Sequence, residues 1–173
     1  KKQEPGFVPL ILRPATVCGF SPRLRLDLTV NILTNLAVNN RKITVFGGEQ
    51  MRPNIHIEDV TDLYVQSLDW SDQSIDGKIF NAGYDNHKIS EIAEITREVV
   101  GQDVEVVTTP TDDLRSYHIS SDKIKNELGY TPKRSVQDAV IDLTKAFDAG
   151  KIPSSMTDMR YYNIKTMQAL KLK

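Results

Sequence analysis

The apolar run Phe-Val-Pro-Leu-Ile-Leu at residues 7–12 decides the fold class. It is too short for a buried helix, contains the β-branched residues Val8 and Ile11, and lies between Gly6 and Pro14, which predicts a strand. A strand that is apolar on both faces is typical of a parallel sheet with helices on each side. The run therefore predicts an α/β protein.

The rest of the chain alternates between short strands and amphipathic helices. Further strands are predicted at 42–46, 78–82 and 104–107, and helices at 24–38, 59–68, 90–101, 121–128 and 135–150. The segments 71–77 and 84–88 are predicted as a turn and a loop, and the tail after Pro153 as irregular with one short helix from Ile164. This order of elements supports the α/β class.

Polar residues and glycines mark the ends of these helices. Asp59 and Ser90 are predicted N-caps, because a side-chain oxygen can accept a hydrogen bond from the free N–H groups of a first turn. Ser135 and Asp138 have the spacing of a capping box, and Gly129 suits the left-handed residue that ends a helix. For Asp59 this reading as a cap is preferred over a catalytic role.

Length, charge and cysteine content limit the possible functions. The chain has 173 residues, with 22 Lys and Arg against 23 Asp and Glu, so its net charge of −1 argues against nucleic acid or an anionic membrane as partner. No apolar run approaches the roughly 18 residues of a membrane span. The single cysteine, Cys18, excludes an internal disulfide and favours a cytoplasmic location. Because the chain opens with Lys1 rather than Met, we read it as a C-terminal fragment.

Four blocks of sequence resemble one enzyme family. Residues 11–19, Ile-Leu-Arg-Pro-Ala-Thr-Val-Cys-Gly, are similar to the Arg-Pro-x-x-Val-Tyr-Gly-Pro strand and loop of extended short-chain dehydrogenases/reductases that act on nucleotide sugars, the NAD-dependent epimerase/dehydratase family. Cys18 replaces the usual Tyr, and Phe20 replaces the usual Pro. Phe-Asn-Ala-Gly at 80–83 matches a late strand of the family's sheet, and the resemblance covers about residues 7–148. The other blocks follow in the family's order at 43–47, 52–60 and 115–132.

The resemblance implies how the chain is divided. It predicts an α/β fold in which the end of a Rossmann-like parallel sheet is interleaved with a small α/β substrate-binding domain. The segments that would complete the dinucleotide-binding domain are 7–19, 50–70 and 78–84. The substrate-binding domain would consist of 20–48 and 85–150, followed by a tail at 151–173.

Two features of the family's N-terminal half are missing from this sequence. No two of its glycines are two residues apart, so the glycine-rich dinucleotide fingerprint is not here. The family's helical Tyr-x-x-x-Lys pair would also lie before Lys1, and we expect no catalytic residue in this chain. Tyr84 and Lys88 have the right spacing but lie in a predicted loop, whereas such a pair needs a helix to become adjacent. The cofactor, NAD or NADP, would be bound mostly by the missing half.

The resemblance also places the candidate contacts. Pro14 and Val17 would touch the cofactor, and Thr16 would face the sugar. The remaining substrate contacts would be Arg25 and Asn31, then Thr44 and Phe46 at the nucleobase. Arg52 and Arg115 would meet the diphosphate. The alternatives are that Pro14 only shapes its loop and that Phe46 belongs to the core.

The arginines also have plain structural alternatives. The basic stretch 23–25 could contact the phosphates of a nucleotide sugar or be a solvated edge, and Arg52 and Arg115 could form surface ion pairs with Asp112 or Asp113. The chain's three histidines lack the spacing of metal ligands, so no metal site is expected. Cys18 is expected to be a small apolar residue in a loop, because nothing near it in the sequence would lower its thiol pKa.

The function that the resemblance implies is the nucleotide-sugar-binding portion of an NAD-dependent epimerase, dehydratase or 4-ketoreductase, that is an isomerase, lyase or oxidoreductase. The alternative is a non-catalytic nucleotide-binding module of the same fold, and a flavin- or metal-dependent enzyme ranks third. We expect the intact protein to be a homodimer. The isolated chain should self-associate, because an exposed parallel edge and a bare apolar face favour it.

Overall fold

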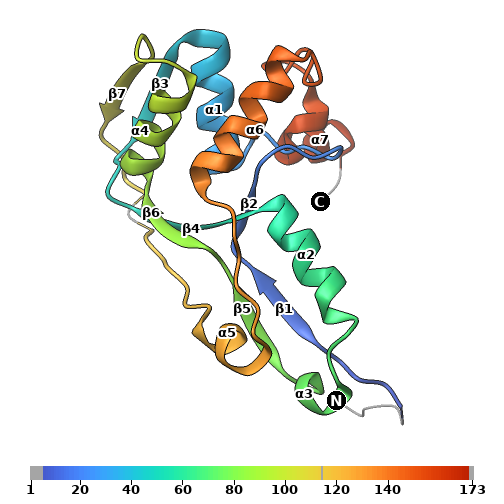
Figure 1. The fold of residues 1–173 in the computed structure, drawn as a ribbon. Coiled ribbons are helices and arrows are strands. Elements are labelled where there is room, and N and C mark those ends of the chain that lie inside the picture. The colour runs from blue at the N-terminus through green and yellow to red at the C-terminus, as the bar shows by residue number, and fades with distance from the viewer. Residues whose placement is uncertain (1–5, 114, 172–173) are drawn as a thin grey trace.

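The computed structural model describes residues 6–113 and 115–171. The chain is elongated, with a lower unit around β1 and β5 and an upper unit around β3 and β7 (Figure 1). The strands are β1 Ile11–Pro14, β2 Thr16–Cys18, β3 Lys42–Phe46, β4 Met51–His56, β5 Ile79–Ala82, β6 Asp85–Lys88 and β7 Glu105–Thr109. The helices are α1 Thr29–Asn40, α2 Ile57–Ser67, α3 Asp72–Ile75, α4 Ile89–Val100, α5 Asp122–Leu128, α6 Val136–Asp148, the 3-10 helix η1 Met159–Tyr161 and α7 Asn163–Ala169.

The strands form three small sheets, and parallel pairing dominates them. β1 pairs with β5 and β3 pairs with β7, both in parallel. In the third sheet β4 lies between β2, which runs parallel to it, and β6, which runs antiparallel. The α/β class is therefore confirmed.

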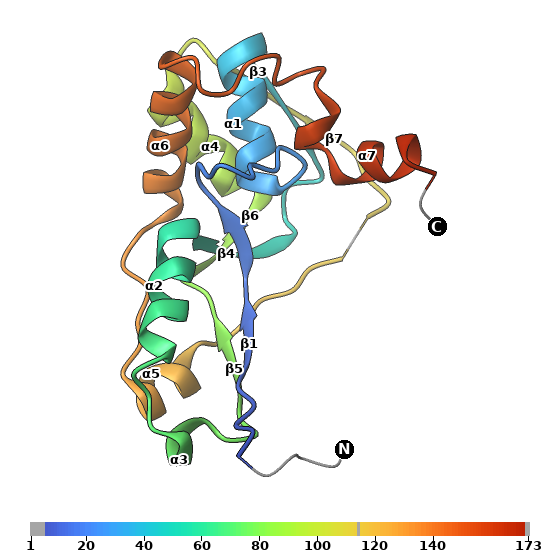
Figure 2. The ribbon, with the colours of Figure 1, turned by 90° about the vertical axis from the view of Figure 1, so that its right-hand side faces the viewer.

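Each unit has its own core. In the upper unit α1, α4 and α6 pack together and α4 contacts both β3 and β7, around Val30, Ile43, Ile92 and Val140. In the lower unit Phe80, Leu63 and Ile124 form a second core beneath β1 and β5. Figure 2 shows α2 and α5 on one side of these two strands, with no helix of the described chain on the other.

The prediction that the first strand is buried on both faces is wrong. β1 begins only at Ile11, and that side chain is 45% exposed. The residues are apolar enough for a covered strand, but only one helical layer is present beside it within the described residues. Exposed apolar side chains also occur beside this strand in the sequence and on α2 and its end; they are Phe7, Tyr64, Val65 and Leu68.

The helix predicted at 24–38 begins five residues later, at Thr29. Residues 24–28 are not helical, yet Leu24 and Leu26 are buried. They belong to a third cluster that also contains Leu143 and Tyr161. Both side chains are therefore buried by contacts with distant segments and not by the face of a helix.

Three strands were missed: β2, which lies in a segment expected to be a loop, β4 and β6. β4 contains Pro53, which usually argues against a strand with neighbours on both sides. At Pro53 only β6 is alongside, because β2 begins opposite Asn54. β6, predicted as a loop, consists of the polar residues 85–88 and has no apolar alternation to reveal it.

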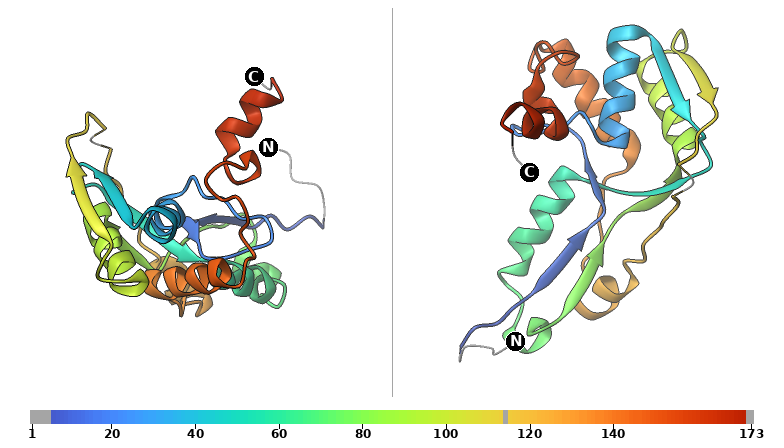
Figure 3. Two further views of the ribbon diagram at one scale, coloured as in Figure 1. Left: turned by 90° about the horizontal axis from the view of Figure 1, so that it is seen from above. Right: turned by 180° about the vertical axis from the view of Figure 1, so that it is seen from behind.

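Two of the four predicted capping positions are confirmed. Ser135 accepts a hydrogen bond from the N–H of Asp138, whose carboxylate accepts one in return, and Gly129 is left-handed with φ of 70°. Ser90 is not a cap, because α4 begins one residue before it and its hydroxyl donates to the carbonyl of Gly48. The predicted turn at 71–77 contains the short helix α3, and the tail holds η1 and α7, which projects from the body of the molecule (Figure 3).

Candidate ligand-binding site

A pocket of about 440 Å³ opens at the carboxyl end of β2. Its walls come from β2, from the loop that follows it, and from the first turns of α1 and α2; we call it the β2 pocket. Ligands of open parallel sheets bind beyond the carboxyl ends of strands, so this is where a ligand is expected. Among the residues that line it are Thr16, Val17, Arg23, Arg25, Asn31 and Ile57. The structure thus brings together four predicted contacts: Thr16, Val17, Arg25 and Asn31.

Asn31 holds the loop that forms one wall of the β2 pocket. Its side chain is almost fully buried, with 3% exposed. Its Oδ1 accepts a hydrogen bond of 3.1 Å from the N–H of Gly19, and its Nδ2 donates one of 2.8 Å to the carbonyl of Arg25. One amide therefore ties both ends of the loop 19–25 to α1.

Gly19 is required where β2 turns into this loop. Its φ is +97°, which L side chains rarely adopt, and a Cβ would lie 2.9 Å from Nε2 of His56. His56 is buried, and its Nδ1 accepts a hydrogen bond from the N–H of Glu58 at the start of α2. The imidazole therefore caps α2 with one nitrogen, and its other nitrogen lies close to Gly19 at the start of the loop.

Two arginines enter the β2 pocket from this loop. Arg25 Nε donates to Asp27 Oδ1 at 2.9 Å. Arg23 donates from Nη1 to the carbonyl of Arg160 at 3.1 Å and from Nη2 to Asn163 Oδ1 at 2.9 Å. Both guanidinium groups are therefore held in place before any ligand binds.

A second group of predicted contacts lies at the end of β3. Thr44 is half-buried in β3, and Phe46 is 62% exposed, so the alternative that Phe46 is core is wrong. Arg52, on β4, donates from Nη1 to the carbonyls of Met51 at 2.9 Å and Arg115 at 2.6 Å. Its guanidinium also lies 5.1 Å from the centre of the Tyr117 ring. Arg52 thus joins β4 to the segment around residue 115.

Arg115 forms the surface ion pair that the sequence left open as an alternative. Its Nε and Nη2 donate to the two oxygens of Asp113 at 2.7 and 2.6 Å. These hydrogen bonds hold the pKa of the Asp113 carboxyl well below its usual range. The Arg115 side chain is 83% exposed, so the pair lies in solvent. A shallow pocket of about 320 Å³ beside it is lined by Gly47, Glu49, Gln50, Thr111 and Ser116.

Pro14 belongs to neither group. It is exposed at the carboxyl end of β1, opposite Ala82 at the end of β5. The two parallel strands therefore end side by side, with Pro14 at their open edge.

Asp59 is an anchor rather than the cap that we predicted. His56 caps α2, while the Asp59 carboxylate lies inside the protein with 1% of the residue exposed. Its Oδ2 accepts the N–H groups of Lys133 and Arg134 at 3.1 and 2.9 Å, and its Oδ1 accepts Arg134 Nη1 at 2.9 Å. The hydroxyl of Tyr130 donates to the Asp59 carbonyl at 2.7 Å. This anchor fixes the segment 130–134, which links α5 to α6.

Cys18 is a buried thiol that does not ionise readily, as expected, although it lies in β2 rather than in a loop. Burial raises the pKa of its thiol to about 12, and its Sγ donates to the carbonyl of Ile55. Within residues 6–113 and 115–171 no cluster of His, Cys, Asp and Glu could hold a metal ion. In the same part of the chain no helix is long and apolar enough to cross a membrane.

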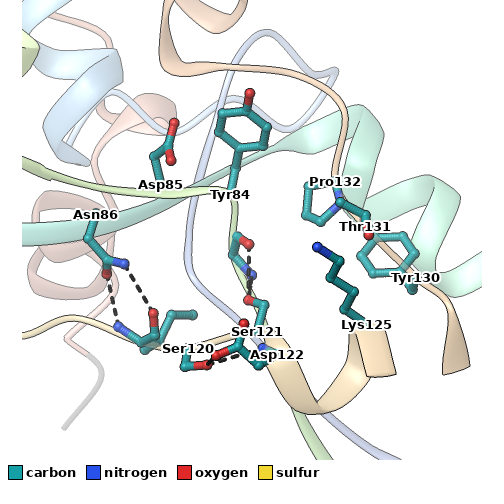
Figure 4. A pocket seen from close by; sticks show the side chains of 12 residues that line it. Tyr84, Asp85, Asn86, Ser120, Ser121, Asp122, Lys125, Tyr130, Thr131 and Pro132 are labelled. Carbon is teal, nitrogen blue, oxygen red and sulfur yellow. Dashed lines mark hydrogen bonds between the residues drawn. The ribbon is translucent and has the colours of Figure 1, made fainter. Parts of the chain in front are cut away.

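Tyr84 and Lys88 do not lie on a helix, which such a pair needs to become adjacent. The segment is a strand, not the predicted loop, and Lys88 Nζ binds Glu49 at 2.7 Å. Tyr84 instead lines a pocket of about 380 Å³ between β6 and the segment 119–132, into which Lys125 points (Figure 4). None of the predicted contacts lines this pocket.

Comparison with known proteins agrees with this arrangement. The sequence profile of the NAD dependent epimerase/dehydratase family matches residues 1–83. Residues 1–83, just under half of the chain, are therefore similar to this family. A UDP-glucose 4-epimerase of Corynebacterium glutamicum is 32% identical over 103 residues, which are 58% of this chain and 31% of that protein.

Solved structures of family members have the same fold. The UDP-glucose 4-epimerase of Thermotoga maritima, solved with UDP-glucose, matches with a TM-score of 0.68 and 25% identity over 81% of this chain and 46% of its own. The UDP-glucuronic acid 4-epimerase of Bacillus cereus, solved with UDP-glucuronic acid and NAD, matches with a TM-score of 0.67 and 21% identity over 81% and 45%. The chain thus spans 31% to 46% of the length of these relatives.

Proposed function

We propose that this chain is the nucleotide-sugar-binding portion of an NAD-dependent sugar-nucleotide epimerase or dehydratase. The β2 pocket carries this proposal, because it collects the sugar-facing Thr16, the cofactor-facing Val17, and the substrate positions Arg25 and Asn31 at the carboxyl end of a parallel strand. The alternative is a non-catalytic nucleotide-binding module of the same fold.

The division of the chain supports the same proposal. We assign 7–19, 50–70 and 78–84 to a dinucleotide-binding domain, and 20–48 and 85–150 to a substrate-binding domain. The lower core is built mainly from the first three segments and the upper core mainly from the other two, although Ile124 and Tyr130 of 85–150 also pack into the lower core. The β2 pocket then lies where the first domain passes into the second.

The residues present fit one end of a bound NAD or NADP. Pro14 stands exposed at the carboxyl ends of β1 and β5, and Val17 lines the β2 pocket beside it in sequence. Such a position suits contact with the nicotinamide, which supplies hydride transfer when the cofactor is bound. No glycine-rich pyrophosphate loop occurs in this sequence, so we infer that the rest of the cofactor is held elsewhere in the intact protein.

In this proposal the chain binds and orients the substrate, and proton transfer is left to groups outside it. The guanidinium of Arg52 would hold the diphosphate, and Phe46 is free to meet the nucleobase because its ring is exposed. Asn31 has both amide groups engaged with the protein, so it would act chiefly by keeping the loop 19–25 in place.

Binding and turnover separate the two candidate functions. UDP-glucose is titrated by calorimetry into the intact protein and into its Thr16→Val variant, with Thr144→Val on α6 as a control because that hydroxyl bonds only within its own helix. We expect saturable binding that only Thr16→Val weakens. Incubation with UDP-glucose and NAD, followed by product analysis, then distinguishes an enzyme from a binding module. Binding unaffected by Thr16→Val would contradict the proposed site.

A further inference from the structure

We propose that the β2 pocket recognises an acidic group on the sugar itself, so that the substrate is a nucleotide-linked uronic acid rather than a neutral sugar. This inference rests on the proposed function and adds the class of substrate to it. The groups that would bind the carboxylate are the guanidiniums of Arg23 and Arg25, with Thr16 beside them in the same pocket.

The charge of the pocket favours an anion. Two arginines line it, and none of the described lining residues is a carboxylate. Asp27 lies behind Arg25 and balances one positive charge at 2.9 Å. Arg23 is held by a backbone carbonyl and an amide oxygen, both neutral. One positive charge is therefore left uncompensated, which matches a single carboxylate.

The geometry of Arg25 leaves its outer face available. Only Nε is engaged, with Asp27, and its two Nη nitrogens make no hydrogen bond to the described part of the chain. Asp27 is itself fixed, because its Oδ2 accepts the N–H of Asn163 at 2.9 Å. A guanidinium with its inner edge anchored and its outer nitrogens free is prepared for a carboxylate, which it can bind through two parallel hydrogen bonds.

The anion would be on the sugar because the diphosphate has other partners. Arg52 and Arg115, the positions expected to meet the phosphates, are hydrogen-bonded to one another and do not line the β2 pocket. Thr16, the position expected to face the sugar, does line it. A neutral sugar would offer these guanidiniums only hydroxyl oxygens, whose hydrogen bonds to a cation are weaker than those of a carboxylate.

A pair of ligands tests this inference. UDP-glucuronic acid and UDP-glucose share the nucleotide, the diphosphate and the ring, and differ in a carboxylate against a hydroxymethyl group. Calorimetry on the intact protein should show binding of UDP-glucuronic acid that is about tenfold tighter or more, the effect of one charged hydrogen bond. The Arg25→Gln variant should reduce this ratio to near one, because it should weaken UDP-glucuronic acid by about tenfold more than UDP-glucose.

Controls keep the result interpretable. Arg97→Gln on α4, away from the pocket, should preserve the preference, and Arg25→Lys should retain part of it because a point charge remains. Equal affinity for the two ligands would overturn the inference and leave the proposed function standing. Equal weakening of both by Arg25→Gln would also overturn it, since the arginine would then be a phosphate contact. Binding of neither ligand would refute the proposed function and this inference together.

Discussion

Replacing the buried carboxylate of Asp59 should destabilise the protein much more than replacing its exposed neighbour. In Asp59→Asn the single remaining oxygen can still accept the two backbone N–H groups of residues 133 and 134. The amide nitrogen then faces the Arg134 guanidinium, so one charge-assisted hydrogen bond of 2.9 Å is lost. Such a bond contributes about 1.5–3 kcal/mol. For a protein of this length, that corresponds to a fall in Tm of roughly 3–12 °C.

Urea unfolding followed by fluorescence measures this loss, and an unchanged m-value shows that only stability has moved. Asp62→Asn is the matched control, because Asp62 contacts the same Arg134 nitrogen at 3.1 Å but its side chain is 44% exposed. We expect that variant to lose less than about 1 kcal/mol. If both variants lost the same small amount, the assignment of Asp59 as the anchor of the segment 130–134 would be wrong.

Three further predictions concern ligands, pH and assembly. In the intact protein, Arg52→Lys should weaken UDP-type ligands by about 1.5–3 kcal/mol and leave NAD affinity unchanged, as calorimetry can check, because lysine cannot replace a guanidinium fork. The free energy of unfolding should fall as pH rises from about 9 towards 12, because the pKa of the Cys18 thiol is near 9.0 in the unfolded chain and about 12 when buried. Urea titrations at alkaline pH measure this fall, and the Cys18→Ala variant should lack this part of it. Residues 1–173 alone should show no NAD reduction with any nucleotide sugar. They should sediment as dimers or larger species, because exposed apolar side chains such as Ile11 and Leu68 favour self-association. Turnover by this chain, or a clean monomer that binds no hydrophobic dye, would contradict those expectations.

Local chemistry explains which elements the sequence could predict. The capping box at Ser135 and the left-handed Gly129 act within a few residues, so the ends of α6 and α5 were found. The burial of β1 depends on which layers lie beside it, and an apolar run cannot report that. The bond between Asp59 and Arg134 joins residues 75 apart, and nothing in either segment indicates it.

The candidate site divides in the same way. Thr16, Val17, Arg25 and Asn31 were named from a resemblance that preserves their order, and the structure places all four in one pocket. The sequence could not show that the Asn31 amide accepts a hydrogen bond from Gly19 and donates one to Arg25, because only the path of the loop brings these groups together. Arg23 was predicted only as part of a basic stretch that either contacts phosphates or lies in solvent, and its place in the pocket depends on contacts with the distant tail.

The clasp between the tail and the pocket loop has a consequence for synthesis on the ribosome. Asp27 and Asn163 are 136 residues apart, so at roughly 5–20 residues per second the loop is made about 7–27 seconds before its partner exists. During that interval the N–H of Leu26 also lacks the carbonyl of Tyr161 that accepts it in the finished fold. A nascent or prematurely terminated chain can therefore complete both cores around β1 and β3 while the arginines of the β2 pocket remain unpositioned. Ligand affinity would then be among the last properties that the growing polypeptide acquires.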